Sequence, residues 1–131
     1  MHKLLQPDGW PRPAGYASGV AASGRLVFVS GQIGWTPDGR FAALDLVGQV
    51  AQALRNVVAV LQEAGARPEH VTRMTWYLVD RRDYLAQTRE VGAAYREVMG
   101  KHFPAMSVVQ VAALLEEKAL VEIEVTAVVP A

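Results

Sequence analysis

The chain of 131 residues is 51% hydrophobic and 20% charged, which is typical of one globular domain spanning residues 1–131 and not of a disordered chain. Thirteen basic residues balance thirteen acidic ones, so the sequence offers no basic field for nucleic acid, and the absence of cysteine excludes disulfides, thiolate metal sites and cysteine nucleophiles. No run of apolar residues is long enough for a membrane helix or a signal peptide, so we expect a soluble, cytoplasmic protein.

The first part of the chain predicts two short strands and a loop. Residues 1–15 contain three prolines and are expected to form an irregular lead-in. The runs 16–22 and 25–33 have the composition of strands, and the serine and glycine between them favour a hairpin turn. The segment 33–41 contains Pro-Asp-Gly and is predicted to be a surface loop.

A helix is expected next. Asp45 can cap its first turn and Gly65 can end it, and apolar residues recur between them at helical spacing. This pattern predicts an amphipathic helix that lies on another layer of the protein. The expected inward set is Val47, Val50, Leu54, Val57, Val58 and Leu61, and the expected outward set is Gln49, Gln52, Arg55, Gln62 and Glu63.

The second half of the chain predicts three strands and one more helix. Residues 71–79 are rich in β-branched and aromatic residues, and the runs 106–114 and 119–129 read as strands on either side of a charged link. A helix is predicted from Asp83 to Gly100. Its expected inward set is Tyr84, Leu85, Thr88, Val91, Tyr95 and Val98.

The resulting order, β-β-α-β-α-β-β, predicts an α+β fold with both helices on one face of a sheet. Nothing else in the chain is available to cover the other face. The strands nevertheless carry apolar residues on both faces, for example Leu26 and Phe28 on one and Val27 and Val29 on the other. An apolar patch of this size is rarely left in water, so we infer that other copies of the chain bury it.

Five stretches resemble the RidA/YjgF family of small trimeric proteins: GYASGV at 15–20, LVFVSGQI at 26–33, the D-x-x-D-Y pattern at 80–84, FPAMSVVQVAAL at 103–114 and VEIEV at 121–125. They span nearly the whole chain in the family's order. The resemblance implies a chorismate-mutase-like α+β fold with a mixed sheet, assembled as a homotrimer with clefts between subunits. It also implies hydrolysis of enamines and imines of 2-amino acids to 2-keto acids and ammonia, without a cofactor.

The resemblance carries four of the family's site residues onto this chain, namely Tyr16, Ser30, Gly31 and Glu122. The fifth does not match, because Met106 stands where the deaminase branch has an arginine after Pro-Ala. An arginine holds a carboxylate through two parallel charge-assisted hydrogen bonds, and a thioether cannot. We therefore expect a substrate other than a simple 2-imino acid.

Three smaller departures from the family point the same way. Trp35 follows the SGQIG segment, in a loop that is expected to border the cleft and to add apolar area. Leu115 stands where the family often has proline, and Thr88 where it often has asparagine. Together with Met106, these residues indicate a ligand that is less polar than an imino acid.

Glu122 is the candidate catalytic residue. In a subunit cleft its carboxylate can orient a water for attack on a C=N bond or accept the proton of that water. The alternative is a solvated glutamate on a wet strand face. Glu124, two positions further along, is expected to share the face of Glu122 and to serve solubility or subunit contact.

The other candidates also have plain structural interpretations. Ser30 can donate its hydroxyl to a ligand beside the backbone N–H of Gly31, or it can satisfy local backbone groups. Tyr16 can close the pocket or be a buried aromatic residue. Met106 can form the pocket floor or belong to the core. Arg73 can replace the missing cation, or it can simply be exposed.

Trp76 is expected to be a packing residue. The three histidines, His2, His70 and His102, match no metal-ligand spacing, and SGQIG lacks the spacing of a phosphate-binding loop, so we predict neither a metal nor a cofactor. Two functions stay open. One is an enamine or imine hydrolase acting on a small molecule, and the other is a non-catalytic module that holds a metabolite or a partner protein in the same cleft.

Overall fold

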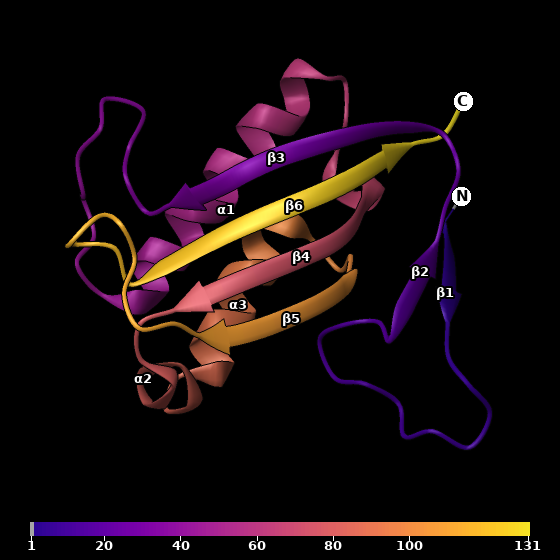
Figure 1. Ribbon diagram of the computed structural model, residues 1–131, viewed down its shortest axis with the longest axis horizontal. Helices are drawn as coiled ribbons and strands as arrows, with labels where there is room; N and C mark the ends of the chain where they lie inside the picture. The colour runs from indigo at the N-terminus through magenta and orange to yellow at the C-terminus, as the bar shows by residue number, and fades with distance from the viewer. Residues whose placement is uncertain (1) are drawn as a thin grey trace.

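The computed structural model describes residues 2–131, whose helices and strands are drawn in Figure 1. The strands are β1 (Lys3–Leu5), β2 (Gly19–Ala21), β3 (Arg25–Ile33), β4 (Val71–Leu78), β5 (Ala105–Gln110) and β6 (Val121–Val129). The helices are α1 (Leu46–Glu63), α2 (Arg81–Leu85) and α3 (Thr88–Met99), with a short 3₁₀ turn η1 (Pro68–His70). None of these described helices combines the length and apolarity that crossing a membrane requires.

Four strands form one sheet in the order β3-β6-β4-β5. β6 runs antiparallel to β3 and to β4, whereas β5 runs parallel to β4, so the sheet is mixed. Parallel neighbours need a crossover connection, and α2 and α3 provide it between β4 and β5. Figure 1 shows α1 and α3 behind the sheet, on the same face. The predicted α+β class, the mixed sheet and the placement of both helices are confirmed.

The N-terminal strands depart from the prediction. β2 pairs antiparallel with β1, and this pair lies to the side of the four-stranded sheet (Figure 1). The hairpin predicted between 16–22 and 25–33 is therefore wrong, and the lead-in is not wholly irregular. Gly24, with a φ of 146°, passes so close to Val129 that a Cβ on it would lie 2.1 Å from the Val129 carbonyl oxygen. This passage past the end of β6 leads β2 away from β3, whereas a tight turn would place them side by side.

Helix α1 begins and ends as predicted. The Asp45 carboxylate caps it by accepting a hydrogen bond from the Gly48 N–H at 3.1 Å. Gly65 follows its end with a φ of 69°, a conformation that favours glycine. The buried stripe of the helix includes the predicted Val50, Leu54, Val57 and Leu61.

Gln49 was predicted on the outer side of α1, and that prediction is wrong, because the residue is fully buried. Its Nε2 donates to the Lys118 carbonyl at 2.9 Å, and its Oε1 accepts from the Leu120 N–H at 2.8 Å. Gly34 makes room for it, since a Cβ on Gly34 would lie 2.7 Å from the Gln49 Cβ. Helical periodicity counts glutamine as outward-facing, but this amide fastens the link before β6 to the helix.

The second predicted helix is in fact two, α2 and α3. The Gln87 side chain spans the break by donating a hydrogen bond to the Asp83 carboxylate at 2.6 Å. Val91 of α3 is buried as predicted. Leu85 is 64% exposed, so its predicted inward orientation is wrong, whereas Thr88 is exposed but borders the cavity described below. Because α2 and α3 are separate helices, their side chains do not follow the single apolar stripe that one continuous helix would have.

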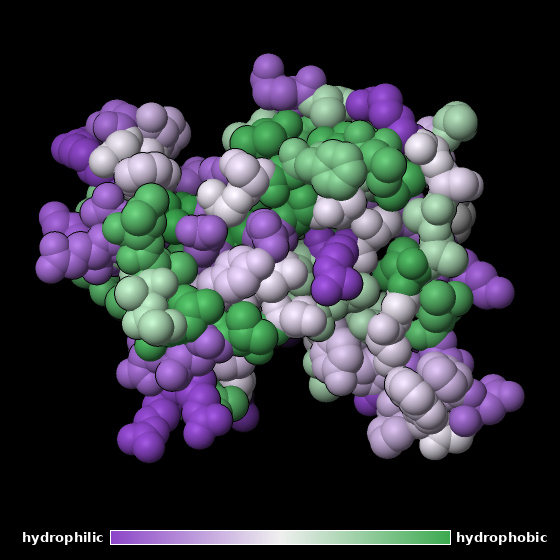
Figure 2. All heavy atoms as spheres, in the orientation of Figure 1, coloured by the Kyte–Doolittle hydropathy of each residue, from purple (hydrophilic) through white to green (hydrophobic). Residues whose placement is uncertain are grey.

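The hydrophobic core lies between the sheet and the helices. Trp76 of β4 points to this side and is only 1% exposed, as expected of a packing residue. On the other face, which we call the open face, Leu26 and Phe28 of β3 are 59% and 73% exposed. Figure 2 looks onto the open face and shows apolar atoms gathered over β3 and polar residues over the central strands. The chain itself therefore leaves this face uncovered, and its burial by other copies stays a prediction.

Candidate functional site

The predicted site residues fall on opposite faces of the sheet. Glu122 precedes the core residue Ile123 on β6, so its side chain is directed to the open face. Met106 pairs in register with the core residue Met74, so it lies on the helix side. Tyr16 lines the same cavity as Met106. One sheet therefore separates the candidate carboxylate from the candidate pocket floor.

A β-bulge in β3 brings two further candidates to the open face. Between Val29 and Gln32 the register with β6 shifts by one residue, so Ser30 and Gly31 together stand opposite Glu124. Bulges re-aim side chains and are frequent beside functional sites. The alternation of an ordinary strand would have sent Ser30 and Gly31 to opposite faces.

Gly31 and Glu122 are in direct contact. A Cβ built on Gly31 would lie 2.2 Å from Glu122 Oε2, so the carboxylate occupies the space that any other residue would fill. The φ of Gly31 is not positive, so the glycine is required for space and not for a special backbone conformation. The family motif identified both residues, but their contact becomes visible only in the structure.

The two carboxylates of β6 have different environments. The Tyr77 hydroxyl donates a hydrogen bond to Glu124 Oε1 at 2.5 Å, and this bond is the largest cause that raises the pKa of Tyr77 above its ordinary value. Glu122 forms no hydrogen bond and no ion pair with another residue of the described range 2–131. Glu122 therefore keeps its oxygens free for water or a ligand, whereas Glu124 is already engaged.

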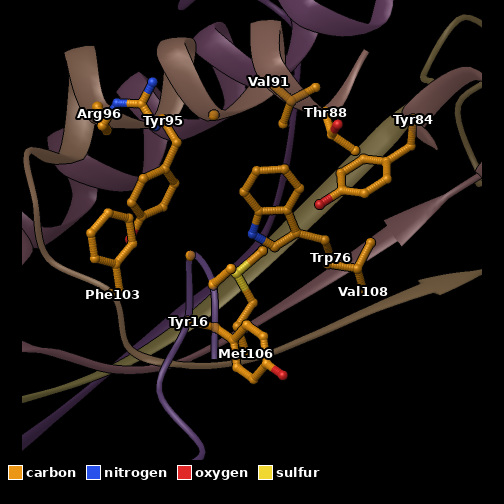
Figure 3. A pocket seen from close by; sticks show the side chains of 13 residues that line it. Tyr16, Trp76, Tyr84, Thr88, Val91, Tyr95, Arg96, Phe103, Met106 and Val108 are labelled. Atoms are coloured by element: carbon orange, nitrogen blue, oxygen red, sulfur yellow. The ribbon is translucent and has the colours of Figure 1, made fainter. Parts of the chain in front are cut away.

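A cavity of about 470 Å³ lies between α3 and the edge strand β5 (Figure 3). Met106 and Val108 are the β5 side chains that line it. Because β5 is the edge strand beyond β4, its helix-facing side chains are only partly covered. The lining residues are Ala14, Gly15, Tyr16, Trp76, Tyr84, Thr88, Val91, Gly92, Tyr95, Arg96, Phe103, Met106 and Val108.

Tyr16 reaches this cavity because the lead-in is tied to the start of β5. The Ala17 N–H donates to the Pro104 carbonyl at 2.9 Å, and Ala17 also forms a bridge with Ala105. Tyr16 is 45% exposed, so it is not the buried aromatic residue of the alternative interpretation. Met106 is half-buried and combines both of its interpretations, since it lines the cavity and packs against the core.

Sequence reasoning did not identify Trp76, Tyr84 or Gly92 as cavity residues. Burial raises the pKa of Tyr84, whose ring meets the Trp76 indole edge-on at a centroid distance of 6.4 Å. One signal was present in the sequence, because a glycine in the middle of a predicted helix usually has a packing or functional reason. No comparable sequence signal marked Trp76 as a cavity residue, since a tryptophan in a strand most often only packs against the core.

Trp35 joins neither group of site residues within the chain. Its ring packs against Phe41 with centroids 6.2 Å apart, and it lines a separate hollow with Asn56 and Val60 of α1. Asn56 Nδ2 holds the loop by donating to the carbonyls of Ile33 and Trp35 at 3.0 and 2.9 Å. The single chain thus does not place Trp35 beside the cavity or beside Glu122.

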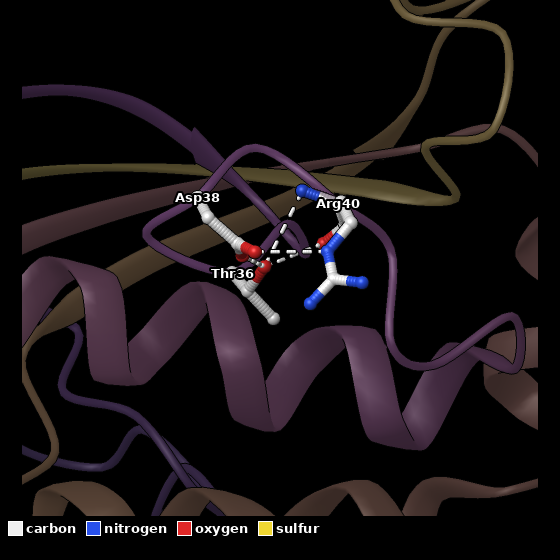
Figure 4. A network of polar contacts seen from close by, with 3 residues as sticks. All are labelled: Thr36, Asp38 and Arg40. Carbon is white, nitrogen blue, oxygen red and sulfur yellow. Dashed lines mark hydrogen bonds and ion pairs between the residues drawn. The ribbon is translucent and has the colours of Figure 1, made fainter.

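A polar network closes the loop that follows Trp35 (Figure 4). The Thr36 hydroxyl donates to the Asp38 carboxylate, and Arg40 Nε pairs with Asp38 Oδ2 at 2.9 Å. The hydrogen bond from Thr36, and after it that from Arg40, lowers the pKa of Asp38. The network shapes the loop and lies apart from both groups of site residues.

Arg73 is exposed and lies on the open face, where it lines a shallow hollow with Ser30, Thr75 and Glu124. Within one chain it therefore cannot supply the missing cation beside Met106, which is on the other face. Among residues 2–131, no three histidine, aspartate or glutamate side chains gather in an arrangement that could hold a metal ion.

Comparisons with known proteins place this geometry in a family. The sequence model of the family described as Endoribonuclease L-PSP matches residues 11–129. A RutC family protein of Synechocystis is 37% identical over an alignment of 135 positions, gaps included. The alignment covers 98% of this chain and 97% of the relative. A crystal structure of a protein of unknown function of the conserved Rid protein family, from Yersinia pestis, matches with a TM-score of 0.86 at 30% identity, covering 98% of each chain. The chain belongs to the RidA/YjgF family.

Another similar protein is the 2-iminobutanoate/2-iminopropanoate deaminase of Salmonella typhimurium. It is 33% identical over an alignment of 132 positions, gaps included, which covers 98% of this chain and 97% of the relative. The present chain keeps Tyr16, Ser30, Gly31 and Glu122 of the motifs that the resemblance identified, and Met106 follows Pro104 and Ala105. In this RidA/YjgF chain the five residues form two groups on opposite faces of the sheet.

Proposed function

We propose that this protein is a single-domain, cytoplasmic, homotrimeric hydrolase of reactive enamines or imines. In the reaction, water adds to the C=N carbon, the nitrogen gains protons, and the C–N bond breaks to release ammonia and a carbonyl compound. Membership of the RidA/YjgF family and the similarity to a 2-iminobutanoate/2-iminopropanoate deaminase support this class of reaction. No cofactor takes part in the proposed steps.

The observation that carries the proposal is the free carboxylate of Glu122 on a face that the chain leaves open. Met106 and its cavity lie on the opposite face, and no described residue that lines the cavity carries a carboxylate, so a neighbouring copy is the proposed source of one. The exposed side chains of Leu26 and Phe28 supply the apolar surface that such a contact buries. Trp35 borders the resulting cleft only if a neighbouring subunit brings it there.

Each site residue has a role in the proposed mechanism. Glu122 orients the attacking water and accepts its proton. The Ser30 hydroxyl and the Gly31 N–H donate hydrogen bonds to the ligand and stabilise charge as it develops. Tyr16, from the other group, closes the cavity. Met106 gives the cavity an apolar, adaptable floor and offers no anchor for a carboxylate, so the substrate is not a simple 2-imino acid.

The test compares two variants that each remove one negative charge from the same strand face. Glu122→Gln should lower kcat/KM by about 10²–10⁴-fold, the usual contribution of a positioned base. Glu124→Gln is the matched control and should stay within a few-fold of the native enzyme, because that carboxylate is engaged by Tyr77. The decay of imines generated in situ would be timed for both. Equal effects of the two substitutions would remove the assigned role of Glu122.

Assembly is tested by sedimentation, where the native protein should run as three chains per particle. Phe28→Glu should shift the particle towards monomers, because it places a charge in the apolar part of the open face. A stable native monomer would contradict the proposal, since one chain holds only half of the site.

The alternative is a non-catalytic module that uses the same cleft to hold a metabolite or a partner protein. The specific observation in its favour is Met106, which removes the family's carboxylate anchor. This alternative is correct if a panel of imines shows no turnover while Glu122→Gln still weakens ligand binding. Ribonuclease activity, which the family's name mentions, is not part of this proposal. The 13 basic and 13 acidic residues of this chain leave no net positive charge to attract RNA.

A further inference from the structure

We propose that the cavity beneath α3 receives a bulky side chain of the substrate that carries a ring, and that the indole N–H of Trp76 donates a hydrogen bond to an acceptor on that ligand. The substrate class is then an imine or enamine with an aromatic substituent, and not a short-chain one. This inference rests on the proposed function and specifies which substrates the site accepts.

The first observation is an unpartnered polar atom. Trp76 is only 1% exposed, and its Nε1 is buried without a hydrogen-bond partner among the described residues. Buried donors nearly always have a partner, and one left alone is costly. Figure 3 shows the indole nitrogen on the side of the ring that faces Met106, whose side chain lies between it and the cavity. A ligand acceptor would satisfy this donor once the flexible methionine side chain moves aside.

The second observation is the character of the walls. Tyr95 and Phe103 stack with ring centroids 5.6 Å apart, and the Tyr95 hydroxyl donates to the His102 carbonyl, which fixes this wall. Tyr84 lies on the other side of the indole in Figure 3. Aromatic rings prefer stacked or edge-on neighbours, so these walls suit another ring. A cavity of about 470 Å³ falls within the range of small-molecule sites, and a methyl or ethyl group would leave most of it empty.

The third observation is Gly92, in the middle of α3. Glycine is unfavourable inside a helix, and this one has no positive φ that would require it. A Cβ at this position would meet only the end of the Arg96 side chain, at 3.3 Å. Neither backbone conformation nor packing therefore explains the glycine. It does leave free volume in the cavity, which it lines.

Binding of two neutral ketones tests the inference, since ketones are stable relatives of the carbonyl product. The probes are 4-phenylbutan-2-one and butan-2-one, which differ by the phenyl ring. Burial of the ring should make the first bind at least about tenfold more tightly to the native protein. The three tryptophans give three indole N–H signals in a proton–nitrogen correlation spectrum, and the signal of Trp76 should shift on binding. Equal affinities, or a Trp76 signal that does not move, would overturn the inference without any variant.

A pair of leucine substitutions on α3 locates the binding. Gly92→Leu fills the cavity and should abolish the preference for the phenyl ketone. Ala93→Leu, at the exposed neighbouring position outside the cavity, is the matched control and should keep it. Retention of the preference in Gly92→Leu would place the ligand elsewhere.

The outcomes separate this inference from the proposed function. If the native protein prefers the phenyl ketone but hydrolyses no imine, the inference about the cavity is supported and the proposed hydrolase function is contradicted. If the native protein hydrolyses aromatic and short-chain imines with equal kcat/KM and binds both ketones equally, the proposed hydrolase function is supported. The inference about the cavity is then contradicted.

Discussion

Gly31→Ala separates the stability of the fold from the position of the Glu122 carboxylate, the proposed base. The new Cβ would lie 2.2 Å from Glu122 Oε2 and 2.6 Å from its Cδ. Ordinary contacts are longer, so the carboxylate must retreat by about 1 Å or more. A shift of about 1 Å in a catalytic group can cost roughly a hundredfold in rate, which corresponds to about 2.7 kcal/mol of transition-state stabilisation.

The fold should tolerate the same substitution. The φ of Gly31 is not positive, so alanine needs no strained backbone conformation, and the clashing atoms, with Cγ at 2.8 Å included, all belong to the Glu122 side chain, which must move. Loss of glycine's freedom in the unfolded chain should stabilise the protein by about 0.4–1 kcal/mol. The expected signature is therefore a kcat/KM about a hundredfold lower with an unchanged or higher Tm.

The assay times the decay of imines generated in situ, beside thermal unfolding of the same samples. Gly19→Ala is the control, since this glycine also lacks a positive φ and its Cβ would meet only the Leu5 side chain, at 3.3 Å. It should keep native kinetics. If Gly31→Ala retains native kcat/KM on an active native enzyme, the contact between Gly31 and Glu122 has no part in catalysis.

Three further predictions follow from individual contacts. The native protein is expected to hydrolyse 2-iminopropanoate slowly, and Met106→Arg should raise this rate by roughly a hundredfold; a native rate that already equals the variant's would contradict the anchoring argument. Gln49→Ala should destabilise the protein by about 2–4 kcal/mol in urea unfolding, because it strips buried backbone groups of their partners, whereas the exposed Gln62→Ala should stay within about 0.5 kcal/mol. The hydrogen bond to Glu124 raises the pKa of Tyr77, so its contribution to stability is present below the ordinary tyrosine pKa of about 10 and is lost as the pH rises through the folded value. Glu124→Gln should lower the pH at which one tyrosine ionises in an absorbance titration, and an unchanged titration would show that the bond is absent in solution.

Helix α1 shows how much of the fold is local. One short segment of the sequence contains its apolar period, the capping carboxylate of Asp45 and the glycine after its end, Gly65. The structure agrees with each of them. Gln49 on the same helix was placed wrongly, because its bonding partners belong to a segment about seventy residues away. The same reason explains the N-terminal error, since β2 joins a strand from the lead-in that no local pattern identified.

The candidate site divides in the same way. The amino-acid sequence alone determined the α+β class, the order of the main elements, the family motifs with Glu122 and Gly31, and the methionine at position 106, because periodicity, turn chemistry and motif spacing are properties of short stretches of chain. The tertiary structure decided which faces these residues occupy. A one-residue bulge in β3 places Gly31 against Glu122, and the edge position of β5 opens a cavity beside Met106 on the opposite side. Register, bulges and strand order arise from pairing between distant segments, so no local pattern could state them.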